Sequence, residues 1–285
     1  MMRLLAKPLL EVKQLELKQK TAQLIQKLGR APHLAVVLVG EDPASQVYVS
    51  KKGLAAESVG FTHETILFPH HTNVNDVRAK VEELNRNPEV DGILIQRPLP
   101  PQFNEADAVL WVDPKKDVDC LHPENVGLLV NGNPRFTPCT PGGIMELLQF
   151  YKIEVSGKIA CVIGRSSIVG KPLAALLLSK NASVIQIHRT TQDPISLCKQ
   201  ADLVFAAAGS RALVNQDWIK PGATVIDVGI HRDSSGKLHG DVDFDSVSAI
   251  ASAMTPVPGG VGPMTIQILL ENTYTSALAK SAKFS

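Results

Sequence analysis

The stretch KIACVIGRSSIVGKPLA, residues 158–174, places an apolar run, a loop with two glycines and the start of a helix in direct succession. A short apolar run of this kind is typical of a buried strand in a parallel sheet. Gly164 permits a tight turn, Gly170 lets the backbone approach a ligand closely, and a helix N-terminus attracts phosphate. The order of these elements favours a nucleotide-binding loop. The spacing is G-x5-G rather than G-x-G-x-x-G, so an ordinary tight strand-to-helix turn remains the alternative.

The residues after the next strand bear on which nucleotide is bound. Enzymes that prefer NAD usually place an acidic residue there, on the ribose 2′-hydroxyl. This chain has Arg189 after the strand SVIQIH and Arg165 in the glycine loop itself. Because cations favour a 2′-phosphate, we predict NADP as the cofactor. The alternative is that Arg189 is an ordinary solvated arginine.

Strand and helix patterns alternate through the chain in two series, which predicts two α/β domains, the second Rossmann-like. A Pro/Gly-rich segment at 131–143 separates the two series, and a stiff loop at 255–263 precedes a final helix. We therefore expect a catalytic domain of residues 1–140, completed by the C-terminal helix 263–285, and a nucleotide domain of residues 141–262. The predicted strands are 34–39, 64–68, 91–96, 158–164, 183–188, 202–209 and 223–229. The predicted helices are 10–29, 45–58 with Ser45 as N-cap, 75–86 with Val77, Val81 and Leu84 on one face, 169–180, 194–200 and 263–280.

Composition narrows the class of protein. The 285 residues are 44% apolar and 20% charged with a net charge of +1, so there is no electrostatic reason to expect nucleic acid or an anionic membrane as partner. No apolar run reaches the roughly 18 residues of a membrane span, and no signal peptide is indicated. The four cysteines lie far apart, without metal-ligand spacing. They are expected to be buried, reduced thiols of a cytoplasmic protein.

The stretch SQVYVSKK, residues 45–52, places Tyr48 and Lys52 four positions apart. On a helix these two side chains share a face, whereas Lys51 is turned away by roughly 100°. Tyr-x-x-x-Lys is also the catalytic pair of short-chain dehydrogenases, but in that family the nucleotide loop precedes the pair. Here the loop follows it, which excludes that family. From spacing alone, an ordinary surface pair is the alternative.

Two further segments add polar groups to the first domain. Gln96 ends the strand DGILIQ, and ligands of open α/β sheets bind beyond the carboxyl ends of the strands. The segment DPKKDVDCLHP contributes Asp113, Asp117 and Asp119. A metal site formed by these acids is one alternative. Two intervening lysines and the absence of EF-hand spacing argue against it, so no metal is predicted.

Eight motifs together are similar to one known family. In chain order they are VGEDPASQVYVSKK, DGILIQRPLP, DPKKDVD, TPCTPGG, GRSSIVGKP, DVGI, GDVDF and TPVPGGVGPMT, within residues 34–275. The chain resembles the bifunctional methylenetetrahydrofolate dehydrogenase/methenyltetrahydrofolate cyclohydrolase family. The resemblance implies NADP-dependent oxidation of 5,10-methylenetetrahydrofolate, then hydrolysis of the methenyl product to 10-formyltetrahydrofolate. It also implies an active-site cleft between the two domains and a homodimer whose ligands are small tetrahydrofolate derivatives.

Roles for individual residues follow from the same resemblance. Lys52 matches the catalytic lysine, whose pKa a partly apolar cleft would lower by desolvation. Gln96 matches the glutamine that positions this lysine, Tyr48 the tyrosine that stacks on the aminobenzoate ring, and Asp119 the acid that pairs with the pterin. Further substrate-binding residues by resemblance are Pro256, Val257, Pro258, Gly259, Gly260 and Thr273. Cofactor-binding residues by resemblance are Gly164, Arg165, Ser166, Ile168, Gly170, Arg189 and Ile230.

Some positions depart from the family pattern. Cys120 stands where the family usually has glycine, Arg97 where an apolar residue is common, and His231 where asparagine is usual. The serine that normally follows the second nucleotide strand is absent beside Arg189. Arg97 and Cys120 keep a second hypothesis open, an NADP-dependent dehydrogenase without the hydrolytic step. A non-catalytic nucleotide- or folate-binding protein is a third.

Overall fold

The computed structural model describes residues 1–281, which form two compact α/β units. The first unit contains Val12–Thr137 and the C-terminal residues from Ile266, and the second contains Met1–Glu11 and Pro138–Thr265. The predicted fold class, two α/β domains, is confirmed. The first eleven residues group with the second unit and not with the rest of the predicted domain 1–140.

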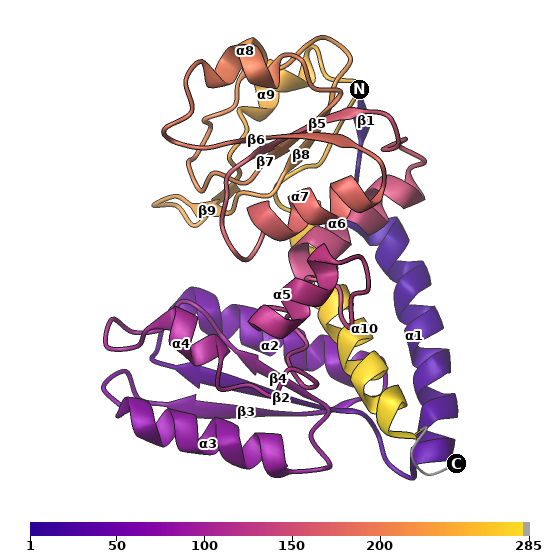
Figure 1. Ribbon diagram of the computed structural model, residues 1–285, viewed down its shortest axis with the longest axis vertical. Coiled ribbons are helices and arrows are strands. Elements are labelled where there is room, and N and C mark those ends of the chain that lie inside the picture. The colour runs from indigo at the N-terminus through magenta and orange to yellow at the C-terminus, as the bar shows by residue number, and fades with distance from the viewer. Residues whose placement is uncertain (282–285) are drawn as a thin grey trace. The chain divides into compact units, whose positions relative to one another are not determined.

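The first unit is built on a three-stranded parallel sheet in the order β3-β2-β4. The strands are β2 (His33–Val39), β3 (Thr62–Phe68) and β4 (Gly92–Ile95). They are linked by α2 (Pro43–Ser58) and α3 (Val74–Arg86). Because the chain steps from β2 to one neighbour and then crosses back to the other, right-handed connections place α2 and α3 on opposite faces, as Figure 1 shows.

Local sequence explains the limits of these elements. The apolar face predicted for α3 is confirmed, since Val77, Val81 and Leu84 are buried. Ser45 is not the N-cap of α2. Asp42 caps it instead, because its carboxylate accepts the Ser45 N–H at 2.7 Å and Pro43 suits the first helical position. The remaining helices with residues in this unit are α1 (Ala6–Leu28), α4 (Glu105–Val109), α5 (Pro123–Val130) and α10 (Val261–Ser281).

A buried carboxylate joins distant parts of the first unit. Asp91, immediately before β4, accepts hydrogen bonds from Arg30 at 2.7 and 2.9 Å and from Lys280, in the last turn of α10, at 2.8 Å. Its burial disfavours the charged form, but the hydrogen bonds from Arg30 and Lys280 outweigh that effect and hold the pKa of Asp91 below its usual value. The end of α10 is thereby tied to the sheet.

Lys280→Ala is expected to lower the free energy of unfolding by about 1–2 kcal/mol, because it removes one of the charged partners of Asp91. A carboxyl group with a depressed folded pKa stabilises the fold above its unfolded pKa of about 3.9, and this stabilisation is lost as pH falls through the folded pKa. The difference from the parent should therefore shrink in acid. Urea unfolding at neutral and acidic pH measures both effects. Lys27→Ala, on exposed helix surface, is the matched control.

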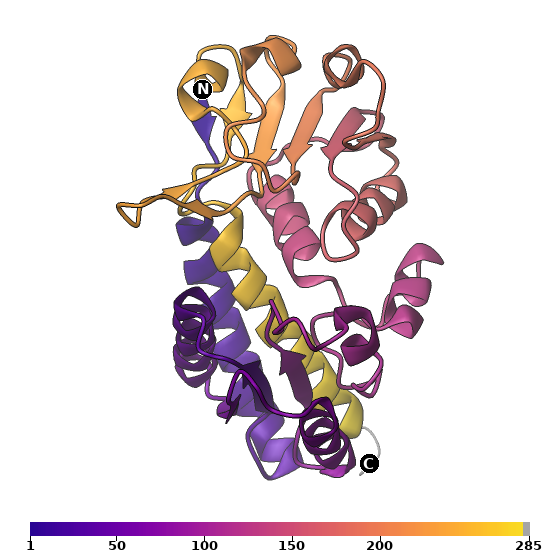
Figure 2. The same ribbon diagram turned by 90° about the vertical axis from the view of Figure 1, so that its left-hand side faces the viewer.

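The second unit contains a six-stranded sheet in the order β1-β11-β8-β7-β5-β6, with every neighbouring pair parallel. In Figure 2 the indigo β1 lies beside β11 at one edge. The strands are β1 (Met2–Arg3), β5 (Ile159–Ile163), β6 (Ser183–Ile187), β7 (Leu203–Ala206), β8 (Thr224–Asp227) and β11 (Ala253–Met254). Its helices are α6 (Cys139–Phe150), α7 (Gly170–Ser179), α8 (Pro194–Cys198), α9 (Phe244–Ser248) and the 3₁₀ turn Gln216–Trp218. A hairpin of β9 (His231–Arg232) and β10 (Leu238–His239) follows β8.

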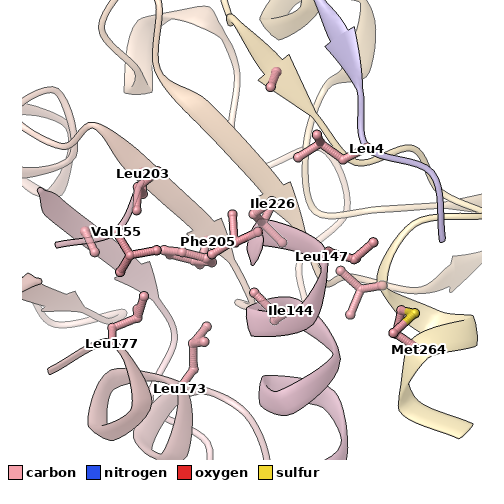
Figure 3. Close-up of a cluster of buried hydrophobic side chains, with 14 of the residues drawn as sticks. Leu4, Ile144, Leu147, Val155, Leu173, Leu177, Leu203, Phe205, Ile226 and Met264 are labelled. Atoms are coloured by element: carbon pink, nitrogen blue, oxygen red, sulfur yellow. The ribbon is translucent and has the colours of Figure 1, made fainter. Parts of the chain in front are cut away.

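The buried core explains why the N-terminus belongs to this unit. Met2 pairs with Ala253, and Leu4 is fully buried in a cluster with Leu147, Phe205 and Ile226 (Figure 3). The boundary between the two units, at Thr137 and Pro138, lies within the Pro/Gly-rich segment 131–143, and the last residues of that segment, from Cys139, form the first turn of α6. Position 143 of this helix requires a glycine, because a Cβ there would lie 2.6 Å from Cβ of Met264.

Candidate active site

Lys52 and Gln96 meet in the first unit. Lys52 Nζ donates a hydrogen bond of 2.8 Å to Gln96 Oε1, and the lysine is only 7% exposed. Gln96 Nε2 donates to the carbonyl of Arg97 at 2.6 Å, which fixes the amide with its oxygen toward the lysine. The glutamine is therefore an acceptor that holds the Nζ group in place.

The topology of the first sheet accounts for this meeting. Lys52 lies on the helix that follows β2, and Gln96 follows β4, the strand adjacent to β2. After β2 the chain continues to β3 on one side of β2, and after β4 it continues to the segment at Asp117 on the other side of β4, so the carboxyl ends of β2 and β4 form a topological switch point. Ligands of open α/β sheets bind at such points.

Tyr48 lies on the same face of α2 as Lys52. Nζ of Lys52 is 5.7 Å from the centroid of the Tyr48 ring, within cation–π range. Burial raises the pKa of Tyr48, so its hydroxyl stays protonated at neutral pH. Lys51 is exposed, as the helix register predicts.

The acids of 113–119 serve different purposes. Asp117 is buried and accepts from the N–H groups of Leu121 and His122 and from Asn125 Nδ2, so it organises the loop. Asp119 is partly buried and lines a small cavity with Asp117 and residues at the end of β4. The bridge between Ile93 and Asp117 places this segment alongside β4. Among the described residues, no group of three His, Cys, Asp or Glu side chains is placed to hold a metal ion.

Two of the unusual residues have structural explanations. Cys120 has φ 61°, a left-handed conformation that explains why glycine is common at this position, and its Sγ lies 3.3 Å from the Phe136 carbonyl. Arg97 reaches Glu105 of α4, with Nη1 3.5 Å from the carboxylate. With these two residues present, Lys52 still contacts Gln96 and Asp119 still lines its cavity.

The remaining predicted substrate residues are divided between the units. Thr273 lies on the part of α10 that belongs to the first unit, where it is fully buried and its hydroxyl donates to the Leu269 carbonyl at 2.8 Å. Pro256–Gly260 belong to the second unit. The carbonyl of Gly259 accepts the Ala6 N–H at 2.9 Å, and a Cβ on Gly260 would lie 2.6 Å from the carbonyl oxygen of Pro256.

The glycine loop of the second unit fits a phosphate. Gly164 has φ 125°, and a Cβ there would lie far inside contact distance of the Ala207 carbonyl oxygen. A Cβ on Gly170 would collide in the same way with the Gly164 carbonyl. Only glycine therefore fits at both positions, and the resulting tight turn, here called the glycine cradle, lies at the start of α7, where the helix dipole favours an anion. Ser166 Oγ accepts from Val169 N and Gly170 N at 3.1 and 3.3 Å.

The other predicted cofactor residues lie at or near the carboxyl end of this sheet. Arg165 and Arg189 are exposed in the loops that follow β5 and β6, and Ile168 is partly buried. Ile230 is 50% exposed just after β8, which leaves an apolar side chain uncovered beside the loops. Because β5 lies between β6 and β7, the loops after β5 and β7 form the switch point of the second sheet.

Fold and site together define an α/β enzyme class with a nucleotide-binding unit and a separate unit that carries a buried lysine–glutamine pair. Residues 4–119 match the family described as "Tetrahydrofolate dehydrogenase/cyclohydrolase, catalytic domain", and residues 138–281 match its "NAD(P)-binding domain". The chain belongs to the tetrahydrofolate dehydrogenase/cyclohydrolase family, as its motifs predicted.

Relatives and solved structures agree with this membership. The chain is 50% identical to the bifunctional protein FolD of Streptococcus thermophilus over 263 residues, 92% of this chain and 93% of the relative. It is 50% identical to that of Streptococcus pyogenes serotype M5 (strain Manfredo) over 277 residues, 97% and 98% of the two chains.

The crystal structure of the bifunctional FolD enzyme from Campylobacter jejuni matches with a TM-score of 0.95 and 45% identity, over 98% of this chain and 99% of that one. The Trypanosoma brucei enzyme, described as complexed with NADP cofactor and inhibitor, matches with a TM-score of 0.92 and 38% identity, over 97% of each chain. No helix within residues 1–281 is long and apolar enough to cross a membrane.

Proposed function

We propose that the protein oxidises 5,10-methylenetetrahydrofolate to 5,10-methenyltetrahydrofolate with NADP and hydrolyses the product to 10-formyltetrahydrofolate. The observation that carries both reactions is the buried Lys52–Gln96 contact of 2.8 Å in a chain that also has the glycine cradle at Gly164. When bound, NADP accepts a hydride. The protein's task in that step is orientation, because the cofactor supplies the chemistry.

Lys52 is proposed to move the proton in hydrolysis. Water forms a bond to the one-carbon bridge and loses a proton, and the carbon–nitrogen bond that breaks needs a proton on the departing ring nitrogen. A neutral amine can accept the first proton and return it as an ammonium. Gln96 supports this role as the acceptor that orients Nζ, since an amide does not itself take up the proton.

Tyr48 and Asp119 are proposed to bind the substrate. The partly covered ring of Tyr48 beside Lys52 suits stacking on the aminobenzoate ring. The Asp119 carboxylate, near the end of β4, suits the amino edge of the pterin. Pro256, Val257, Pro258, Gly259, Gly260 and Thr273 are proposed to complete the substrate site, as the resemblance to the family implies.

Tyr48→Phe is expected to keep the KM for the folate substrate within about threefold of the parent value, because the ring that stacks remains. Tyr48→Ala should raise the same KM about tenfold, since a stacked aromatic contact and its buried area are lost. Steady-state kinetics of methylenetetrahydrofolate oxidation at saturating NADP measures both. Equal losses in the two variants would show that the hydroxyl, and not the ring, carries the role.

The cofactor is proposed to lie over Gly164, Arg165, Ser166 and Gly170, with Ile168 beside the loop. Arg165 and Arg189 supply the positive charge for a 2′-phosphate, since both are exposed near the carboxyl end of the sheet. The uncovered Ile230 suits the nicotinamide ring.

The deciding experiment offers methylenetetrahydrofolate to the purified enzyme with NADP and, in parallel, with NAD. Rapid turnover with NADP and decay of the methenyl absorbance faster than the uncatalysed rate would support the bifunctional proposal. A methenyl species that accumulates and decays only at the uncatalysed rate would favour the monofunctional dehydrogenase. No turnover with either nucleotide would exclude both enzymes.

Domain roles, assembly and location are further proposals. We propose that residues 1–140 with the C-terminal segment 263–285 form the folate-binding catalytic domain, and that residues 141–262 form the NADP domain. We infer a homodimer through the NADP domain from the family resemblance. Light scattering after gel filtration should then give twice the 30.7 kDa of one chain. A cytoplasmic location is supported by the four cysteines, which are buried thiols that form no disulfide within the described residues and suit a reducing compartment.

A further inference from the structure

A carboxylate of the GDVDF segment binds two other segments of the second unit. Asp241 Oδ2 accepts the backbone N–H groups of Ala208 and Gly209 at 2.6 and 2.9 Å. Asp241 Oδ1 lies 2.7 Å from His231 Nε2. Asp241 is fully buried. One side chain thus joins the loop after β7 to the start of the β9–β10 hairpin.

A second aspartate holds the first one in place. The carboxylate of Asp227, at the end of β8, accepts N–H groups from Gly229, Asp241 and Val242 at 3.0, 2.9 and 3.1 Å. Cβ atoms on Gly229 or Gly240 would collide with the Asp241 or Asp227 carboxylate, respectively. The position of Asp241 is therefore determined closely by its own backbone and by the glycines around it.

The loop that Asp241 holds forms a wall of the nucleotide cradle. The Ala207 carbonyl is the group that a Cβ on Gly164 would strike, and the Ala207 N–H bonds to the Ile163 carbonyl at 2.9 Å. Residue 207 is thus packed directly against the phosphate turn, and residues 208 and 209 are the two that Asp241 binds. A shift of this loop would move the carbonyl against which the Gly164 turn packs, and would therefore change the shape of that turn. The two loops follow β5 and β7, at the switch point of the sheet.

We propose that Asp241 is a positioning residue of the nucleotide site, acting through the loop 207–209 on the turn at Gly164. His231 is the third hydrogen-bond partner of the Asp241 carboxylate and helps to hold that carboxylate in place. Asp241 itself makes no contact with the cofactor in this proposal. The inference rests on the proposed function, since it requires NADP at the glycine cradle.

The test compares Asp241 variants by calorimetric titration with NADP in the absence of folate. Asp241→Ala should weaken NADP binding by about 10- to 100-fold, because two N–H groups lose a charged acceptor and the loop is released. Asp241→Asn keeps one oxygen for both N–H groups and should restore affinity to within about threefold of the parent. Asp243→Ala is the matched control, two residues away, because the Asp243 side chain makes no capping hydrogen bond.

Two further measurements separate positioning from general damage. Asp241→Ala should keep the far-UV circular dichroism of the parent, which shows that the helices and sheets of both units remain formed. Hydrogen exchange without ligand should accelerate in peptides that contain 207–212 and remain unchanged in peptides of the first unit. If Asp241→Ala does not fold, Asp241→Glu decides, because it keeps the charge but displaces it by one methylene and should weaken NADP binding measurably.

The outcomes distinguish this inference from the proposed function. A parent enzyme that does not bind NADP would refute the proposed cofactor. If the parent binds NADP, and Asp241→Ala and Asp241→Glu bind NADP with the affinity of the parent, the positioning role is overturned and the proposed cofactor stands. Asparagine as damaging as alanine would also overturn it, because the retained oxygen should hold the loop.

Discussion

Lys52→Ala is expected to slow the hydrolysis of methenyltetrahydrofolate by about 10²–10⁴-fold, the usual contribution of a positioned general acid–base. The reason is that the variant removes a buried amine, which donates a hydrogen bond of 2.8 Å to Gln96. NADP affinity should stay at the parent value, because the glycine cradle belongs to the other unit. The decay of methenyl absorbance, corrected for the uncatalysed rate, measures the first quantity, and calorimetry measures the second.

Lys51→Ala is the matched control for this variant. It removes the same side chain from the next position of α2, which is exposed, and should leave hydrolysis within about twofold of the parent rate. The proposed role of Lys52 would be wrong if Lys52→Ala hydrolysed the substrate as fast as the parent, or if Lys51→Ala lost as much activity.

Gly164→Ala is expected to weaken NADP binding by roughly 100-fold. Two costs add here. The backbone at φ 125° is rarely adopted by residues with a side chain, and the new methyl would occupy the space of the Ala207 carbonyl. Both the turn and the loop after β7 would have to move, so the cradle would lose its shape. Calorimetric titration of the folded variant with NADP gives the affinity, and urea unfolding gives the accompanying loss of stability.

Gly157→Ala separates the two costs. Gly157 has φ 72°, but a Cβ there would meet nothing within 4 Å. This variant should lose about 1 kcal/mol of stability from its backbone conformation and bind NADP as the parent does. A normal NADP affinity in Gly164→Ala would contradict the assignment of the cradle.

Much of the fold followed from local patterns because these patterns act over short distances. The spacing of Val77, Val81 and Leu84 predicted the buried face of α3, and the apolar run at 159–163 predicted β5. Errors came where short-range signals competed. Ser45 has a good capping side chain, but Asp42 has an equally good one and is followed by Pro43, which suits the first helical position. Helix α6 (Cys139–Phe150) was not predicted, because its first turn contains a proline and two glycines. The two-residue strands β1 and β11 carry too few residues to show any period.

Helix register by itself distinguished Lys52 from Lys51, and the order of motifs by itself determined the family. Both are properties of residue spacing and chain order, which the linear chain contains in full. The tertiary structure alone decided that Gln96 turns its oxygen toward Lys52, that Asp117 organises its loop while Asp119 lines the cavity, and that Asp241 supports the wall behind Gly164. These contacts join segments far apart in sequence, and they depend on strand order and on clearances near 3 Å, which no local pattern records.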